Sequence, residues 1–350
     1  MEDNSDKIED LIKGFDFQSK NEFNWRMESL IKGINEDITI FSGRHKINQK
    51  SDIIYVRAYN LSILNDNNIK HILKVLDIVV SLKNRTYFPN VQVFLSKDHK
   101  YFYLCNKGPF VRLNLIYNLS GVLSDKNLIK WIIYQITFGL YFLHSNNIIH
   151  HDIKASNIYI NEKGGIFIDG FDSAIFKNEK SISFTLNYSS PELLINLQAD
   201  EKVDMWGLGI IMLELYCNEH LILKNENVKN REDAIRNILS FFGRNESYSN
   251  EHLQNLLKED KNIEFTLKKE IVDQIGDKDA IDFLNNLLVF NPNKRFSAKE
   301  ALESNYLKEF RGIDSFEIQP LEFPINYKEL SKDKIDQKRF FEIIQTMIEK

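Results

Sequence analysis

The sequence predicts an α+β protein, in which a small, mostly antiparallel sheet that carries one helix precedes a larger, mainly helical part. Three observations predict this class. Short β-type runs dominate between residues 24 and 105, helical patterns dominate after Lys107-Gly108, and two long helical segments there are strongly apolar. With 350 residues, of which 43% are hydrophobic, the chain is long enough to bury a substantial core.

The first part is expected to contain four strands and one helix. Residues 1–23 are polar, and we expect them to form an N-terminal extension without chemistry of its own. The strands are expected in the runs DITIF, IIYVRAY, VQVFLS and KYFYLC. The helix is expected in NNIKHILKVLDIVVSLKN, between the second and third runs. Together these elements predict a small lobe at residues 24–106.

The larger part begins with a long helix in SDKNLIKWIIYQITFGLYFLHSNN, where apolar residues recur at helical spacing and Ser124 is the expected N-cap. A second helix, VDMWGLGIIMLELY, is apolar nearly all round, which predicts a helix buried on every side. The charged, Asn-rich residues 221–270 predict inserted helices. We place this large lobe at residues 109–310. The C-terminal extension, residues 311–350, is expected to end in an amphipathic helix that docks on the large lobe.

Composition and charge exclude several classes of function. The formal charge of −5 argues against a mainly electrostatic nucleic-acid partner. No run approaches the roughly 18 apolar residues of a membrane span, and the acidic start MEDNSDKIEDLIKG lacks the features of a signal peptide. Cys105 and Cys217 stand far apart, which predicts neither a disulfide framework nor a thiolate metal site. We expect a protein of the cytoplasm, with the nucleus as an alternative.

Residues 148–157, IIHHDIKASN, place three different polar groups on one loop: Asp152, Lys154 and Asn157. The trio suits phosphoryl transfer, because the Asp can accept or orient a hydroxyl proton, the Lys can neutralise the moving phosphate, and the Asn can help to hold a metal ion. The alternative is that the loop is kept for its hydrogen bonds alone.

This loop resembles the catalytic loop of the protein kinase family, H-R-D-x-K-x-x-N, and further motifs follow in the order of that family. TLNYSSPELL at 185–194 resembles the end of the activation segment, and VDMWGLGIIMLEL resembles the central helix of the large lobe. NPNKRFSAKEAL at 291–302 supplies a matching Arg. The resemblance covers residues 109–310 almost throughout and implies a two-lobed protein kinase fold, with residues 24–310 as the kinase-like domain.

The resemblance implies roles for individual residues. Asp204 would bind the backbone of the catalytic loop, and Glu192 would pair with Arg295; these three residues are architectural in the family. Thr185 stands where serine/threonine kinases have a Thr that bonds the catalytic Asp and Lys, which favours that branch over the tyrosine kinases.

Two histidines of the loop receive different roles from the resemblance. His150 would pack and bond inside the large lobe rather than act as a base. His151 replaces an Arg that often reads a phosphate on the activation segment, so regulation through that Arg is not expected.

The nucleotide-binding motifs of the family are incomplete in this chain. In the family a Gly-rich turn approaches the phosphates, a strand Lys contacts them, and a helix Glu pairs with that Lys. Here only Gly33 lies near the expected turn, and acidic residues follow it. Arg57 stands in place of the Lys and Val79 in place of the Glu, with Asp77 on another face of the helix. We therefore expect Arg57 to be a surface or partner-binding residue.

The adenine pocket is less affected by these losses. Cys105 is expected at its gate and Lys107 in the hinge that follows, so the pocket could admit adenine without a metal ion. ATP and Mg²⁺ are the cofactors that the resemblance implies, and the missing motifs predict weak use of both.

The metal-binding motif of the family, D-F-G, is written in another order here, within GIFIDGFDSA at 165–174. Counted without gaps from Asn157, the motif falls on residues 170–172, which are Gly, Phe and Asp, and a Gly at the ligand position offers no carboxylate. A hairpin one residue shorter would make Asp169 the ligand, and Asp172 is the other carboxylate. Both registers depart from the pattern of the family.

These observations lead to two hypotheses. The first is a pseudokinase, a regulatory or scaffolding protein that binds a protein partner and is inactive or strongly impaired as an enzyme. The second is an active, atypical serine/threonine kinase that transfers the γ-phosphate of ATP to protein hydroxyls, with Asp152 as the base and Asp169 or Asp172 at the metal. The joint loss of nucleotide motifs favours the first hypothesis, and the intact loop with Thr185 motivates the second.

Overall fold

The computed structural model describes most of the chain between residues 25 and 348. The described residues are 25–33, 38–45, 53–61, 66–95, 101–107, 110–116, 125–161, 163–179, 185–197, 200–217, 228–241, 267–314, 318–327 and 337–348. The chain divides into two compact units, one with residues up to 110 and from 321 to 350, and the other with residues 111–320. The extension predicted at residues 1–23 lies outside the described residues.

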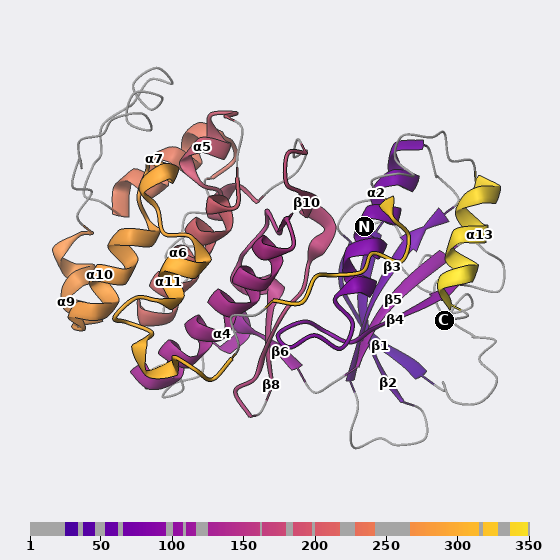
Figure 1. Ribbon diagram of the computed structural model, residues 1–350, viewed down its shortest axis with the longest axis horizontal. Coiled ribbons are helices and arrows are strands. Elements are labelled where there is room, and N and C mark those ends of the chain that lie inside the picture. The colour runs from indigo at the N-terminus through magenta and orange to yellow at the C-terminus, as the bar shows by residue number, and fades with distance from the viewer. Residues whose placement is uncertain are drawn as a thin grey trace. The chain divides into compact units, whose positions relative to one another are not determined.

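The first unit is built on a five-stranded antiparallel sheet (Figure 1). Its strands are β1 (Trp25–Gly33), β2 (Ile38–His45), β3 (Ile53–Asn60), β4 (Val91–Leu95) and β5 (Tyr101–Lys107), in the order β1-β2-β3-β5-β4. The four predicted runs form β2 to β5. The sequence does not predict β1, because polar residues interrupt its alternation, and its pairing with β2 shifts register twice.

Helix α2 (Asp66–Ser81) is the predicted helix of this unit. Apolar side chains at helical spacing bury a broad face of it. Asp77 shares this burial at 1% exposure, and its two carboxylate oxygens accept backbone hydrogen bonds from Ile325 at 2.7 Å and from Tyr327 at 2.8 Å. The C-terminal segment of the chain therefore satisfies a carboxylate that is buried in an apolar helix.

The predicted C-terminal helix, α13 (Gln337–Ile348), belongs to the first unit, which corrects the expectation that it docks on the large lobe. It contacts β4, and Figure 1 shows it, in yellow, beside the strands of this unit. Phe340 and Ile344, one turn apart, are fully buried. Amphipathic spacing predicts the buried face of a helix but not the surface that covers it.

The second unit is mainly helical, and two helices predicted from the sequence form its centre. Helix α4 (Lys126–Ser145) is capped by the side chain of Asp125, whereas Ser124, the predicted N-cap, lies outside the described residues. Helix α6 (Lys202–Cys217) packs against α4 and is buried on nearly every side, because its sequence is apolar all round.

Further helices belong to this unit (Figure 1). They are α3 (Leu113–Ile116), α5 (Pro191–Leu194), α7 (Arg231–Phe241), α9 (Lys269–Ile275), α10 (Lys278–Leu287) and α11 (Ala298–Leu302), with 3₁₀ turns η3 (Ala155–Asn157), η4 (Phe171–Ser173), η5 (Leu186–Tyr188), η6 (Pro292–Lys294) and η7 (Lys308–Phe310). Of residues 221–270, where inserted helices are predicted, α7 and the start of α9 are described. Residues 221–227 and 242–266 lie outside the described residues.

Two small sheets position the loops of the second unit. One has the order β6-β8-β9 and the other pairs β7 with β10. These strands are β6 (Phe110–Arg112), β7 (Ile148–Ile149), β8 (Ile158–Asn161), β9 (Ile166–Ile168) and β10 (Ile175–Phe176). In the β8–β9 hairpin Ile158 lies opposite Ile168, so the residues next to them, Asn157 and Asp169, meet at one end of the hairpin. The backbone N–H of Asp169 donates to the carbonyl of Asn157 at 2.9 Å.

Candidate active site

The predicted catalytic loop lies between β7 and η3, and the buried carboxylate of Asp204 anchors its backbone. Asp204, in the first turn of α6, accepts hydrogen bonds from the backbone N–H groups of His150 at 2.9 Å and His151 at 2.7 Å. His151 has a φ of 68°, in the left-handed region that side chains disfavour. The hydrogen bonds to Asp204 hold the loop in this conformation, which is the arrangement that the resemblance implies for Asp204.

His144, in the last turn of α4, completes the surroundings of Asp204. Its Nε2 lies 2.9 Å from Asp204 Oδ2. Burial raises the pKa of Asp204, but the hydrogen bond and charge of His144 and the backbone bond of His150 outweigh burial and hold this pKa below its ordinary value. Sequence reasoning did not single out His144, although a His at the end of the helix before a polar loop is a recognisable signal.

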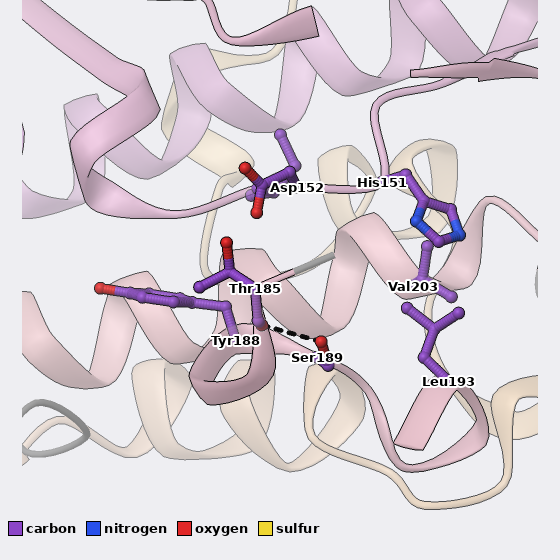
Figure 2. A pocket seen from close by; sticks show the side chains of 8 residues that line it. His151, Asp152, Thr185, Tyr188, Ser189, Leu193 and Val203 are labelled. Atoms are coloured by element: carbon purple, nitrogen blue, oxygen red, sulfur yellow. Dashed lines mark hydrogen bonds between the residues drawn. The ribbon is translucent and has the colours of Figure 1, made fainter. Parts of the chain in front are cut away.

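Asp152, Lys154, Asn157 and Thr185 come together in the structure. Lys154 Nζ lies 2.6 Å from Asp152 Oδ2 and 2.7 Å from Thr185 Oγ1, so one ammonium joins the loop to the segment before η5. Asn157 Nδ2 donates to the backbone carbonyl of Asp152 at 2.8 Å and to Asp152 Oδ2 at 3.0 Å. Figure 2 shows the side chains of Asp152 and Thr185 pointing toward each other.

One oxygen of Asp152 accepts no hydrogen bond from the described residues. Asp152 Oδ1 is buried, and no donor among the described residues reaches it. A small pocket beside it is lined by His151, Asp152, Ile153, Thr185, Tyr188, Ser189, Leu193 and Val203 (Figure 2). A carboxylate with an open acceptor at a pocket that hydroxyl groups also line can accept a proton from an alcohol.

The ring of His151 points away from the carboxylate of Asp152 (Figure 2). In Figure 2 it points toward the apolar side chains of Val203 and Leu193, on the far side of the pocket from the carboxylate of Asp152. Only 4% of His151 is exposed. The position that the resemblance assigns to a phosphate-reading Arg is therefore occupied by a ring that is buried against apolar side chains.

The two aspartates after β9 differ in their surroundings. Asp169 directly follows β9, is 5% exposed, and has its backbone carbonyl 3.0 Å from His150 Nε2. Asp172 lies farther along, in η4, and is half-buried. The β8–β9 hairpin brings the backbone of Asp169 to that of Asn157, whereas the residue whose β-position faces the Asn157 side chain is Gly170.

Asn157 and Asp169 carry the oxygen ligands that Mg²⁺ prefers. Because the amide nitrogen of Asn157 is turned to Asp152, its Oδ1 is the atom left to face a metal ion. In the described part of the chain, no three His, Cys, Asp or Glu side chains gather to hold a metal by themselves. Mg²⁺ would therefore need phosphate oxygens as further ligands. Asn157 could serve such a site, whereas the residue that faces its side chain, Gly170, offers no carboxylate.

Two buried carboxylates fix the segment around η5 and α5. Arg295 donates from Nη1 and Nη2 to the two oxygens of Glu192, at 2.7 Å and 3.0 Å, with both side chains almost fully buried. Tyr188 donates its hydroxyl to Glu214 in α6 at 2.9 Å, and burial together with the charge of Glu214 raises the pKa of Tyr188 well above its ordinary value. Sequence reasoning missed Glu214, although an acid among apolar residues inside a helix signals a buried partner.

The residues of the first unit that the sequence places around the nucleotide lie on its sheet. Gly33 is the last residue of β1 and pairs with Thr39 of β2. Arg57, in β3, is 9% exposed, which contradicts the first of the two predicted alternatives, a surface residue, whereas a partner-binding role stays a prediction. Cys105 is 4% exposed within β5, and Lys107 is the last residue of that strand. The hinge expected around Lys107 stays a prediction, because residues 108–109 lie outside the described residues.

Known proteins share this sequence pattern. The family profile described as protein kinase domain matches residues 44–307. The mitogen-activated protein kinase hog1 of Aspergillus clavatus is 30% identical over 202 residues, which are 53% of this chain and 52% of that protein. Mitogen-activated protein kinase 13 of Arabidopsis thaliana is 28% identical over 235 residues, which are 65% of this chain and 63% of that protein. The chain thus spans about half the length of the first of these relatives.

Fold and comparison agree. The profile match extends over more than half of the chain, and the described elements form the small antiparallel sheet with one helix and the larger helical unit of a kinase domain. Among the described helices, none is both long enough and apolar enough to cross a membrane. On the strength of the profile match and of this two-unit architecture, the chain belongs to the protein kinase family.

Proposed function

We propose that this member of the protein kinase family is a regulatory or scaffolding pseudokinase, which binds a protein partner and transfers phosphate weakly or not at all. One observation carries the proposal. The carboxylate in the middle of α2, that of Asp77, is bonded through both oxygens to the C-terminal segment. The other acid of α2, Asp66, is its first residue.

This observation matters because an active kinase needs an ion pair between a strand Lys and a helix carboxylate to hold the nucleotide phosphates. Strand β3 carries Arg57 in place of the Lys, and a planar guanidinium fork does not replace a compact ammonium. If the Asp77 carboxylate turned to a cation, the backbone N–H groups of the C-terminal segment would lose their acceptor. Losing one preorganised electrostatic partner of a transition state costs on the order of 10²–10³ in rate.

The class of partner follows from the family and its relatives. Both relatives described above are named mitogen-activated protein kinases, which supports a kinase of the serine/threonine type with a protein as partner or substrate. The hydrogen bond between Lys154 and Thr185 supports the same branch, because it joins the loop to the Thr expected there.

An active, atypical serine/threonine kinase is the second candidate, and the open Oδ1 of Asp152 favours it. In that case Asp152 would accept the hydroxyl proton and Lys154 would contact the phosphate. Asn157 and Asp169 would hold Mg²⁺, which when bound neutralises charge on the phosphates.

Thermal unfolding with ATP separates the two candidates, because a ligand stabilises only the state that it binds. For the pseudokinase, ATP should raise the Tm slightly or not at all, and Mg²⁺ should not change that shift. A large shift that requires Mg²⁺, disappears in Asp169→Asn and persists in the matched variant Asp172→Asn would contradict the proposal. Each shift is measured against the Tm of the same variant without ligand.

A further inference from the structure

Gly170 lies where the chain leaves β9, with its backbone against the side chain of Asn157. Its φ of 89° falls in the left-handed region that favours glycine. A β-carbon at this position would lie 2.5–2.7 Å from three atoms of the Asn157 side chain. Non-bonded atoms do not approach a real β-carbon within 3.0 Å, so residue 170 has no room for a side chain unless Asn157 moves.

Asn157 cannot move without losing hydrogen bonds. Its amide nitrogen donates to the backbone carbonyl of Asp152 at 2.8 Å and to Asp152 Oδ2 at 3.0 Å. Its own carbonyl accepts from the backbone N–H of Asp169 at 2.9 Å, which fixes the main chain on both sides of the contact. A side chain at residue 170 would therefore break the contact between the amide of Asn157 and the carboxylate of Asp152.

The residues on either side of Gly170, Asp169 and Phe171, both contact His150. The backbone carbonyl oxygen of Asp169 lies 3.0 Å from His150 Nε2, and the ring centroids of Phe171 and His150 lie 4.9 Å apart. Exchanging residues 170 and 171 would put a phenyl ring against Asn157 and would remove the ring that packs on His150. Gly at residue 170 and Phe at residue 171 therefore each fit the local structure.

We propose that Gly170 is a positioning residue, which holds the amide of Asn157, and through it the carboxylate of Asp152, in the observed arrangement. The order Gly170-Phe171 is then required by the structure of this loop, and a side chain introduced at residue 170 would disturb the loop. The proposal goes beyond the proposed function, because it applies to the loop with or without phosphate transfer.

The first test compares Gly170→Ala with Gly312→Ala. Gly312 has nearly the same φ, 87°, but nothing lies within 4 Å of a β-carbon there. The two variants therefore share the backbone strain, and only Gly170→Ala adds the contact with Asn157. Gly170→Ala should lower the Tm by roughly 3–6 °C more than Gly312→Ala does. Equal losses in the two variants would overturn the proposal.

The second test removes the opposing side chain. In the Asn157→Ala background, Gly170→Ala should cost no more Tm than Gly312→Ala, because the amide that it meets is gone. If Gly170→Ala alone does not fold, recovery of folded protein in the double variant gives the same answer. A loss that is as large with Asn157→Ala as without it would overturn the proposal.

The third test observes the amide directly. Proton–nitrogen correlation spectra of the chain labelled at Asn side chains should show the Asn157 resonance, identified by its loss in Asn157→Ala, at a shift typical of a bonded amide. Gly170→Ala should move this resonance toward the solvent-exposed position, and Gly312→Ala should leave it in place. If the Asn157 resonance does not move in Gly170→Ala, Gly170 does not position this amide, and the proposal is overturned.

Discussion

Asp77 and Ile325 are joined by a hydrogen bond of 2.7 Å across 248 residues of sequence. With the second bond, from Tyr327, it fastens the C-terminal segment to α2, and α13 then packs against β4. The match to the kinase family ends at residue 307, so this segment lies outside the matched domain. Asp77, the one acid of α2 beyond its first residue, is thus engaged by a part of the chain that follows the matched domain.

Asp77→Asn should loosen the C-terminal segment. Asn has one acceptor oxygen, and its amino group would face the second backbone N–H, which would leave a buried donor unpaired at a cost of about 1–3 kcal/mol. Urea unfolding should show a loss of this size, and limited proteolysis should cut residues 321–350 faster. Asp282→Asn, at an exposed position of α10, is the matched control. Equal stabilities of the two variants would argue against this role of Asp77.

Arg295→Lys should destabilise the second unit although it keeps the charge. A lysine cannot supply the two parallel bonds to Glu192, and a buried carboxylate left partly unpaired costs about 2–4 kcal/mol. The free energy of unfolding in urea measures this loss. Arg236→Lys is the control, because Arg236 is 62% exposed and its pair with Asp233 lies on the surface. If both substitutions lowered the free energy of unfolding equally, the buried pair of Arg295 and Glu192 would not be more stabilising than a surface pair.

Asp204→Asn should change how stability depends on pH. Because the pKa of Asp204 is held below its ordinary value of 3.8, the ionised group stabilises the fold above that value. This stabilisation is lost as the pH falls through the lowered pKa of the folded state. Near neutral pH the variant should be less stable by roughly 2–4 kcal/mol, because the bonds from His144, His150 and His151 lose part of their acceptor.

The check on Asp204 is the difference in unfolding free energy between the wild type and Asp204→Asn, followed from neutral to acid pH. This difference should be constant well above pH 3.8 and should narrow below it. A difference that stays constant into the acid range would mean that the carboxylate of Asp204 is not held in its ionised form by the fold.

The features that the sequence predicts are those with local determinants. The apolar spacing of α4, the all-round apolar pattern of α6 and the order of polar residues in HDIKASN each lie within one short stretch. The pairing of Glu192 with Arg295 was predictable only through the resemblance, because 103 residues separate the two. Strand β1, whose alternation polar residues interrupt, gave no comparable signal.

The features that the sequence does not predict depend on partners far along the chain. A single acid in α2 does not reveal that residues 325 and 327 will bond it. Arg57 looked like a surface residue because a charged side chain in a strand gives no sign of what covers it. Counting alone could not choose between the two registers of the metal-binding motif, because the count depends on hairpin length; in the structure the residue whose β-position faces the Asn157 side chain is Gly170.

Phosphate transfer is the most direct test of the proposed function. The full chain and Asp152→Asn are incubated with radiolabelled ATP, Mg²⁺ and a generic protein substrate rich in Ser and Thr. For the pseudokinase, we predict that incorporation by the wild type stays close to that of Asp152→Asn. Strong incorporation by the wild type that is lost in Asp152→Asn, with both proteins equally folded, would contradict the proposal and identify an active kinase.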